Sequence, residues 1–315
     1  MELVTIRKKR SFSFNAVRRF KKSGFLMAMI VPAILFYFIF CYIPMYGIVI
    51  AFQDYQAFLG IEGSEWVGFE NFRIIFDDPT FWRVLMNTIK IGSIKIILAF
   101  LGAVTTAILL NELRMRRVKK TIQVIVTFPH FLSWIIIAGF VSALFEQRGT
   151  INTMILALGG EPIRFLTKGN FFLGLLFASD IWKEAGWGSI IYLATMAGIP
   201  QEQYEAADID GATRLQKIWH VTLPGIKATA ILLLIMSVGG VLSAGFDQII
   251  NLYNSTVADY SEILDTYIYN ILLGDGTFIN PGIGAAVGLF KSVVSFIFVI
   301  TADRIAKACG ERGII

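Results

Sequence analysis

The chain has 315 residues, of which 56% are hydrophobic and 16% are charged, against roughly 45–50% and about 25% in soluble globular proteins. This apolar excess is more than a soluble fold of that length buries, and the two cysteines, Cys41 and Cys309, exclude a disulfide-stapled domain. The net charge is +5. The composition therefore predicts an integral membrane protein.

Stretches of about 20 mainly apolar residues, enough to cross a bilayer, recur six times. The predicted spans cover 25–52, 84–110, 121–145, 171–199, 228–250 and 282–302. The first holds no charged residue, is too long for a signal-peptide core and has no obvious small-residue cleavage site. We therefore expect it to be retained as a helix.

The basic residues indicate how the spans are oriented. Segments 1–24, 111–120, 200–227 and 303–315 together hold 19 lysines and arginines, against five in loops 53–83, 146–170 and 251–281. This asymmetry predicts that both termini are cytoplasmic. The N-terminal cluster could also contact anionic membrane lipid, but it has no stacking platform typical of a nucleic-acid module, so no nucleic-acid partner is expected. Loop 53–83, with Trp66, Trp82 and six acidic residues, predicts either an interfacial aromatic segment or a docking cap.

Segment 200–227 differs from the other connections. Its residues predict a short helix, a sharp turn at Gly211, a second amphipathic helix, and Pro224 where the chain re-enters the membrane. Its apolar residues cannot form a core in so short a loop, so they predict a protein partner. These residues are Ile209, Leu215, Ile218, Trp219 and Val221.

This segment resembles the EAA signature of binding-protein-dependent ABC importer permeases. The matching positions are Glu205, Ala206, Ala207, Gly211, Leu223 and Pro224, and Val221 stands where Ile is usual. Other segments look like the carbohydrate-uptake branch, most similar to its polysaccharide and oligosaccharide permeases, which include one permease of the alginate importer. They are Asn87-Thr88, Phe128-Pro129-His130-Phe131-Leu132-Ser133-Trp134, Gly149-Thr150-Ile151-Asn152 and Trp182-Lys183-Glu184-Ala185-Gly186-Trp187.

The resemblance implies an all-α integral membrane subunit with six transmembrane helices and the type I ABC importer permease fold, which is methionine-importer-like. It implies a second related permease, two ATP-binding cassette subunits, an extracytoplasmic solute-binding protein and a saccharide substrate, in a bacterial cytoplasmic membrane. The chain would be non-catalytic and hold no cofactor, because ATP and Mg²⁺ would bind the partner ATPase. In alternating access, Glu205, Asp210 and Gly211 would belong to a coupling helix seated on that ATPase.

Charged residues inside a span usually face a cavity or a partner, because burying them in lipid costs about 2.5–3.5 kcal/mol each. The predicted substrate-pathway residues are Lys95, Asp180, Lys183, Glu184, Trp187, Asp247 and Lys291. Structural pairing is an equal alternative, and Asp180, Lys183 and Glu184 have the i, i+3, i+4 spacing of an internal pair. The lysines within spans would tolerate a uronate-containing oligosaccharide without requiring one.

Other functional classes have weaker support in the sequence. It lacks the Gly-x-x-x-x-Gly-Lys phosphate loop, His-Glu-x-x-His and Gly-x-Ser-x-Gly, and two histidines, His130 and His220, are too few and too separated for a metal site. An autonomous secondary transporter or channel would leave the EAA-like segment without a purpose. A permease of the same family with a non-sugar cargo stays open, and the sequence does not name the saccharide.

Overall fold

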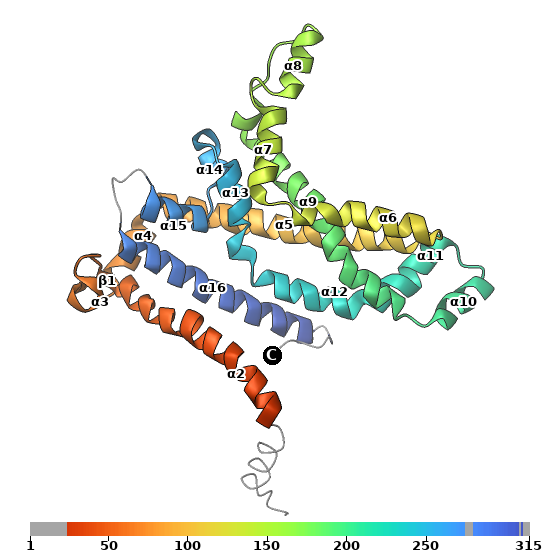
Figure 1. Ribbon diagram of the computed structural model, residues 1–315, viewed down its shortest axis with the longest axis horizontal. Coiled ribbons are helices and arrows are strands. Elements are labelled where there is room, and N and C mark those ends of the chain that lie inside the picture. The colour runs from red at the N-terminus through yellow and green to blue at the C-terminus, as the bar shows by residue number, and fades with distance from the viewer. Residues whose placement is uncertain (1–23, 275–279, 309, 311–315) are drawn as a thin grey trace, which may run out of the picture.

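The computed structural model describes residues 24–274, 280–308 and 310, so the predicted basic N-terminal segment lies outside the described residues up to position 23. The molecule is mostly helical and elongated, with its long helices running along the long axis (Figure 1). The strands in the described part are two residues each, β1 (Gln53–Asp54) and β2 (Glu65–Trp66), paired antiparallel. The all-α expectation therefore holds for the described chain.

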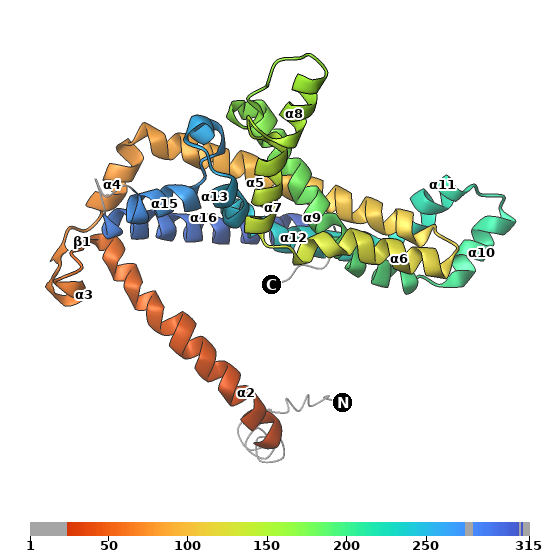
Figure 2. The same cartoon turned by 45° about the horizontal axis from the view of Figure 1, so that its top comes forward.

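The first helical segment diverges from the rest of the bundle (Figures 1 and 2). It comprises α2 (Gly24–Tyr37), a π turn η1 (Phe38–Tyr42) and a 3₁₀ segment η2 (Ile43–Phe52). Its η2 end packs against α16 (Pro281–Ala308). The side chains from Ala28 to Tyr46 are exposed, as expected for a helix that meets lipid or another subunit. The short helices α3 (Gly60–Gly63) and α4 (Glu70–Asp77) follow.

The two helices at the centre are α5 (Pro79–Asn111) and α9 (Gly169–Ala197). Asp78 caps α5 by accepting a 2.8 Å hydrogen bond from the Thr80 N–H, and Pro79 occupies the first turn, where its missing N–H costs nothing. Three buried apolar clusters lie along this pair and the helices around it. The α5–α9 pair therefore forms the axis on which the other elements pack.

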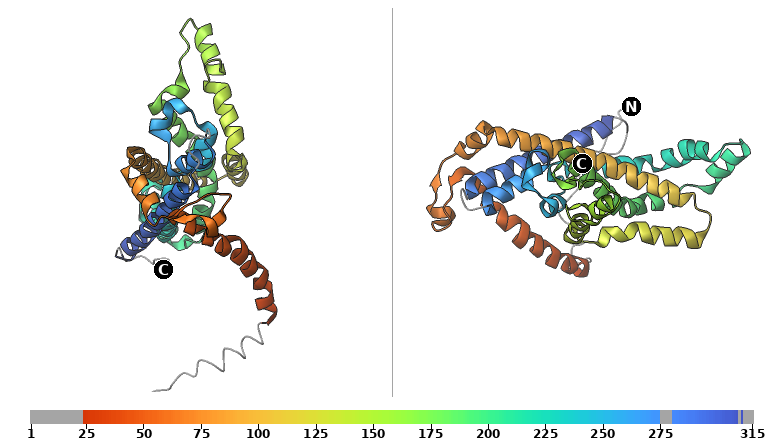
Figure 3. Two further views of the ribbon diagram at one scale, coloured as in Figure 1. Left: turned by 90° about the vertical axis from the view of Figure 1, so that its left-hand side faces the viewer. Right: turned by 90° about the horizontal axis from the view of Figure 1, so that it is seen from above.

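The third predicted span is bent rather than straight. Residues 121–145 fall into α6 (Arg116–Thr127), η3 (Phe128–Phe131) and α7 (Trp134–Phe145), followed by α8 (Thr150–Ala157). The segments Arg116–Phe131 and Trp134–Ala157 meet at 96°. Pro129 cannot donate a backbone hydrogen bond, and the Ser133 hydroxyl caps the new helix by accepting from the Ile136 N–H. As a result α7 and α8 project sideways from the bundle (Figures 1 and 3).

The fifth predicted span, 228–250, is displaced toward the N-terminus. After α10 (Gln201–Ile209), a continuous helix of 25 residues runs from Arg214 to Val238 through α11 (Arg214–Lys217), η5 (Ile218–Thr222) and α12 (Leu223–Val238). Pro224 lies inside this helix instead of beginning a new one. The π turn before it, closed by the Leu223 N–H bonding to the Ile218 carbonyl, accommodates the proline.

The same span then breaks at 239–245. A 3₁₀ turn, η6 (Val241–Ser243), leads to Ala244 (φ 43°) and Gly245 (φ 83°), and α13 (Phe246–Leu252) follows. An alanine in this left-handed region is strained by about 1–2 kcal/mol. The remaining elements are η4 (Phe165–Thr167), η7 (Ser255–Val257), α14 (Ala258–Ser261), α15 (Leu264–Leu273) and α16.

Within the described residues, four helices are long and apolar enough to cross a membrane, or five if the bent α6–α8 pair counts as one span. The predicted fourth span is the one missing from that set. It forms the continuous helix α9, but three of the five residues at positions 180–184 of this helix are charged. The six-span topology and the cytoplasmic position of both termini therefore stay predictions.

The contact between α9 and α6 yields a stability prediction. A Cβ at Gly186 would collide with the Val126 backbone carbonyl, whereas a Cβ at Gly174 on the same helix meets nothing within 4 Å. Gly186→Ala should destabilise the protein by about 1–3 kcal/mol through overpacking. Gly174→Ala should be neutral or stabilising by up to about 1 kcal/mol. Thermal unfolding of the detergent-solubilised protein, followed by size-exclusion chromatography, measures both, and equal midpoints would contradict the close packing.

Candidate functional site

A polar cluster joins three helices near the middle of the molecule. Lys95 on α5 lies 3.4 Å from the Asp180 carboxylate on α9, and its ammonium donates to the Gln248 side-chain oxygen on α13. The Gln248 amide then donates to the Leu176 carbonyl (2.8 Å) and the Ser179 hydroxyl (2.9 Å). Lys95 and Gln248 are buried. The break before α13 brings Gln248 to this position, so it completes the pairing of a buried cation.

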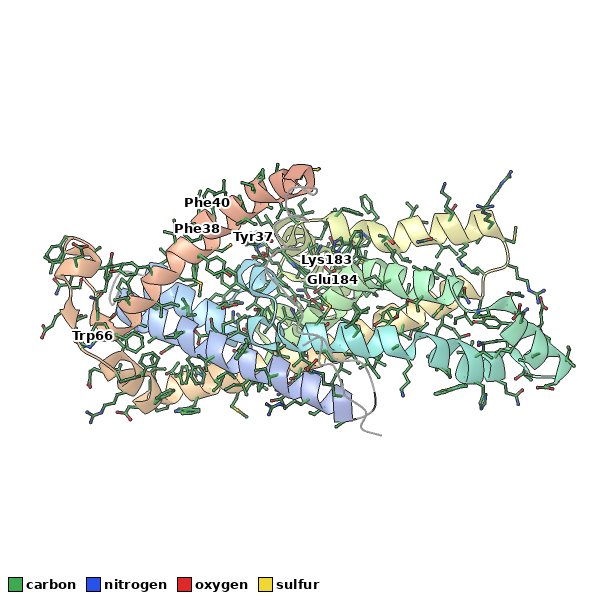
Figure 4. All side chains as sticks on the ribbon, turned by 90° about the horizontal axis from the view of Figure 1, so that it is seen from below. Tyr37, Phe38, Phe40, Trp66, Lys183 and Glu184 are labelled. Atoms are coloured by element: carbon green, nitrogen blue, oxygen red, sulfur yellow. The ribbon has the colours of Figure 1, made fainter. Side chains whose placement is uncertain are left out.

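A second polar group lies further along α9. Lys183 donates to the His130 carbonyl (2.5 Å) and lies 3.6 Å from a Glu184 oxygen, while the other Glu184 oxygen lies 2.8 Å from His130 Nδ1. The His130 ring stacks on Trp187, with centroids 4.4 Å apart and planes 3° from parallel. Lys183 and Glu184 project from α9 near mid-length of the molecule (Figure 4). This group holds the bend at η3 against α9.

An open cavity of about 370 Å³ lies between α5, α9 and the break in the fifth span. Its volume is within the range of small-molecule sites. The lining combines aromatic and small residues with one ammonium and two carboxylates. The side chains that decide its chemistry are those of Lys95, Asp180, Glu184, Trp187 and Tyr192. An exposed indole beside carboxylates suits a ring that carries hydroxyl groups.

Three predicted pathway residues are not part of this cavity's lining: Lys183, which binds the His130 carbonyl, Asp247 and Lys291. The Asp247 side chain is exposed, and its backbone carbonyl accepts a hydrogen bond from Asn251. Lys291 on α16 binds both oxygens of Asp265 on α15, at 2.5 and 2.7 Å. Asp247 therefore points outward and Lys291 ties α16 to α15, which is the structural pairing that the sequence left open, and a role of either residue in a substrate pathway stays a prediction.

Asp265 belongs to a wider polar region where α14 and α15 meet the start of α5. Arg83 binds Asp259 and lies 3.7 Å from Glu262, and the Tyr267 hydroxyl donates to Asp78 (2.9 Å). Burial raises the pKa of the Glu262 carboxyl, and the Asn270 hydrogen bond and the Arg83 guanidinium oppose that rise. The region closes the end of the bundle opposite to α10 and α11.

The EAA-like segment is well formed at the other end (Figure 1). Glu205, Ala206 and Ala207 lie on α10, and Gly211 turns the chain with φ 73°. The side chains of Thr213 and Gln216 form a capping box that starts α11, and Lys217 pairs with Asp208 at 2.6 Å.

Asp210 ends α10, Leu223 is half-buried and Pro224 is exposed. The apolar side chains predicted to meet a partner here are largely exposed, at 88% for Ile209, 70% for Leu215 and 67% for Trp219. This surface has the apolar character expected of a docking face. The role of the EAA-like residues in coupling stays a prediction.

Sequence reasoning missed Gln248, Ser179 and the partnership of His130 with Glu184. A signal for Gln248 was available, because Gly239, Gly240 and Gly245 precede it and weaken any helix there. His130 follows Pro129 and so lies at a bend, which sets it across from α9. No comparable signal existed for Ser179, since its role depends on the position of α13.

Comparison with known proteins places this architecture in a family. Residues 99–309 match the family described as "Binding-protein-dependent transport system inner membrane component". The chain belongs to this family, so it is a membrane permease subunit of an ABC transporter.

Individual members of this family and one solved structure are similar to most of the chain. The chain is 44% identical to the polygalacturonan/rhamnogalacturonan transport system permease protein YteP of Bacillus subtilis (strain 168), covering 92% of this chain and 90% of that protein. It is 41% identical to Protein LplB of the same organism over 93% and 92%. A chain in the crystal structure of a bacterial alginate ABC transporter, in complex with an alginate pentasaccharide-bound periplasmic protein, superposes with a TM-score of 0.84. That chain has 34% identity to this one, over 94% of this chain and 99% of its own length.

The Lys95–Asp180 pair yields a second prediction. Lys95→Met and Asp180→Asn each leave one charge without its partner in a poorly hydrated site, so each should destabilise the protein by about 3 kcal/mol. The double variant should be more stable than the sum of the two losses predicts, because it leaves no unpaired charge. A thermal or urea double-mutant cycle measures this difference. Strictly additive losses would show that the two side chains do not interact.

Proposed function

We propose that this chain is one of two permease subunits of an ATP-driven, binding-protein-dependent importer that moves acidic oligosaccharides inward by alternating access. The observation that carries the proposal is the 44% identity, over 92% of the chain, to a permease named for polygalacturonan and rhamnogalacturonan. A chain in a crystal structure of an ABC transporter for the acidic polysaccharide alginate, with 34% identity, supports the same class of cargo. On this proposal the protein lies in a bacterial cytoplasmic membrane.

The cavity supports recognition of a sugar ring. Trp187 offers an aromatic surface, and the carboxylates of Asp180 and Glu184 can accept hydrogen bonds from hydroxyl groups. One ammonium against two carboxylates gives this chain's lining no excess of positive charge. We therefore assign the selection of acidic over neutral sugars to other chains of the importer, the binding protein or the second permease.

The same lining favours a second candidate function, which is import of neutral oligosaccharides. Carboxylates that face the cavity repel a uronate and attract hydroxyl groups, so the charge alone would suit an uncharged sugar better. The chain also has 27% identity to an arabinooligosaccharide permease of Bacillus subtilis (strain 168), over 90% of its length. The two candidates differ in cargo and share the rest of the mechanism.

The proposal also assigns the two ends of the molecule. The end with α10 and α11 would be cytoplasmic and would seat Glu205, Asp210 and Gly211 on an ATPase that binds ATP and Mg²⁺. The end with α4 and α15 would face the solute-binding protein. The helix α9 would serve as a span turned toward the pore, because its charged residues pair with α5 and η3 rather than meeting lipid.

Uptake measurements separate these functions. We expect the importer, reconstituted in liposomes with its binding protein, to transport oligogalacturonates at least about tenfold faster than uncharged oligosaccharides of equal length. Trp187→Ala should reduce uptake about tenfold because it removes a ring surface from the cavity. Trp182→Ala is the matched control, since Trp182 lies on the same helix outside the cavity lining. A preference for the uncharged sugars would support the second candidate instead.

Lys95 tests where charge is recognised. We expect Lys95→Gln to reduce the uptake of acidic and neutral oligosaccharides by the same factor, because the ammonium is already paired with Asp180 and Gln248. A loss confined to acidic substrates would place charge recognition in this chain and contradict its assignment to the other subunits. The expression level and thermal midpoint of the variant control for misfolding.

The turn at Gly211 tests coupling. The residue has φ 73°, and a Cβ added there would meet no atom within 4 Å, so the position is limited by backbone conformation rather than by space. Gly211→Asn should keep ATPase stimulation, because asparagine adopts this region readily, whereas Gly211→Val should lose most of it. Gly211→Asp tests the effect of an added negative charge alone, because an aspartate side chain has the same shape as that of asparagine. ATPase activity and co-purification of the ATPase are the measurements, and full transport by Gly211→Val would overturn the assigned role.

A further inference from the structure

One face of α6 and η3 has a polar end and an apolar end. Six residues with helical i, i+3 and i+4 spacing line an open cavity of about 380 Å³ with Ile190 of α9 as the opposite wall. They are Lys120, Gln123, Val124, Thr127, Phe128 and Phe131. Arg116 and Arg117 continue the same face by one turn beyond Lys120. The groove is therefore cationic at one end and aromatic at the other.

The cationic end has no acidic partner within the described part of the chain, and the apolar end is largely exposed, although the Phe131 ring packs edge-on against His130 and Trp187. Arg116, Arg117 and Lys120 are exposed, and no acidic side chain pairs with them there. Val124, Phe128 and Phe131 are 61%, 60% and 69% exposed. Three adjacent like charges beside an open apolar groove repel each other and favour an anionic ligand that also carries an apolar part.

Polar atoms inside the groove support the same ligand. Gln123, one turn from Lys120, points a half-buried amide into the same groove. This amide offers donors between the cationic and the apolar end.

We propose that this groove binds one anionic phospholipid. The phosphate lies against Arg116, Arg117 and Lys120, an ester oxygen accepts from the Gln123 amide, and one acyl chain runs past Val124 to Phe131. The 11 residue steps from Lys120 to Phe131 span about 16 Å at a rise of about 1.5 Å each, which is comparable to most of an acyl chain. A cationic site at the membrane surface beside an apolar groove is the arrangement that holds anionic lipid headgroups.

A phospholipid fits better than a helix of another subunit. A packed helix would cover the apolar residues but leave the three cations without an anionic partner. One amphiphile supplies an anionic head and an apolar chain at the spacing of the two ends. The basic end of α6 lies at the same end of the molecule as α10 and α11 (Figures 1 and 2). The inference rests on the proposed placement of α6 in the membrane and does not depend on the cargo.

Lipid titration of the assembled importer tests the site. Native mass spectrometry of the detergent-solubilised complex should show one phosphatidylglycerol bound at this site more tightly than phosphatidylcholine with the same acyl chains. Arg116→Gln with Lys120→Gln should weaken phosphatidylglycerol binding about tenfold or more. Arg114→Gln with Lys119→Gln is the matched control, because it removes two charges from the same cluster without touching the groove lining. This control should change the affinity less than twofold.

A second pair of variants tests the apolar half. Val124→Trp fills the groove from a position that is 61% exposed and should weaken phosphatidylglycerol binding at least fivefold, while Ile125→Trp, at 62% exposed and outside the lining, should not. If the two charge-removing double variants weakened phosphatidylglycerol binding equally, the binding would reflect only the overall positive charge of the surface, and the proposal would be overturned. Equal binding of phosphatidylcholine would also overturn it, as would a complex without bound lipid, which would indicate that the second permease fills the groove. Because binding is measured without transport, failure here leaves the proposed import function untouched, and a failed uptake assay leaves the lipid site untouched.

Discussion

The fold depends on the requirement that a charge inside an apolar bundle must be paired. Lys95 meets Asp180 and Gln248, and this one ammonium therefore fixes α5, α9 and α13 relative to each other. The fifth span cannot remain a continuous helix and still deliver Gln248 to that site, so the break at 239–245, with a strained Ala244, accompanies the pairing. The cavity opens where the helix is broken, and the same polar residues that stabilise the bundle line its wall.

The charged residues of α9 fix the positions of two neighbouring segments. Asp180 pairs with α5, while Lys183 and Glu184 pair with the residues around His130, so one helix anchors two bends in its neighbours. A helix of this kind cannot face lipid on its charged side. On the proposed placement of α9 as a span, this side lies inside the subunit or against another one, and the cavity and Trp187 face away from lipid.

The sequence predicted the local features better than the bends. The EAA-like segment was predicted correctly as helix, turn and helix, because Gly211 and the capping pair Thr213 and Gln216 act within a few residues. The helix α5 starts five residues before the span that hydropathy indicated. Asp78 caps it and Pro79 occupies its first turn, and a search for apolar stretches detects neither residue. The bend of 96° after η3 and the position of Gln248 depend on contacts with α9, which periodicity along one segment does not contain.

The helix from Arg214 to Val238 connects the two functional ends. Its 25 residues span about 37 Å, with the exposed apolar face near Leu215 and Trp219 at one end and the break beside the cavity at the other. Its first turn is fixed to α10 through Lys217 and Asp208, and its far end is followed at once by the turn against α5. Because α-helices are stiff along their axis and turns are not, a displacement of α10 and α11 would reach the bundle through this helix and be absorbed at 239–245. On the proposed mechanism, the wall of the cavity is therefore the part of the chain that would respond to the ATPase.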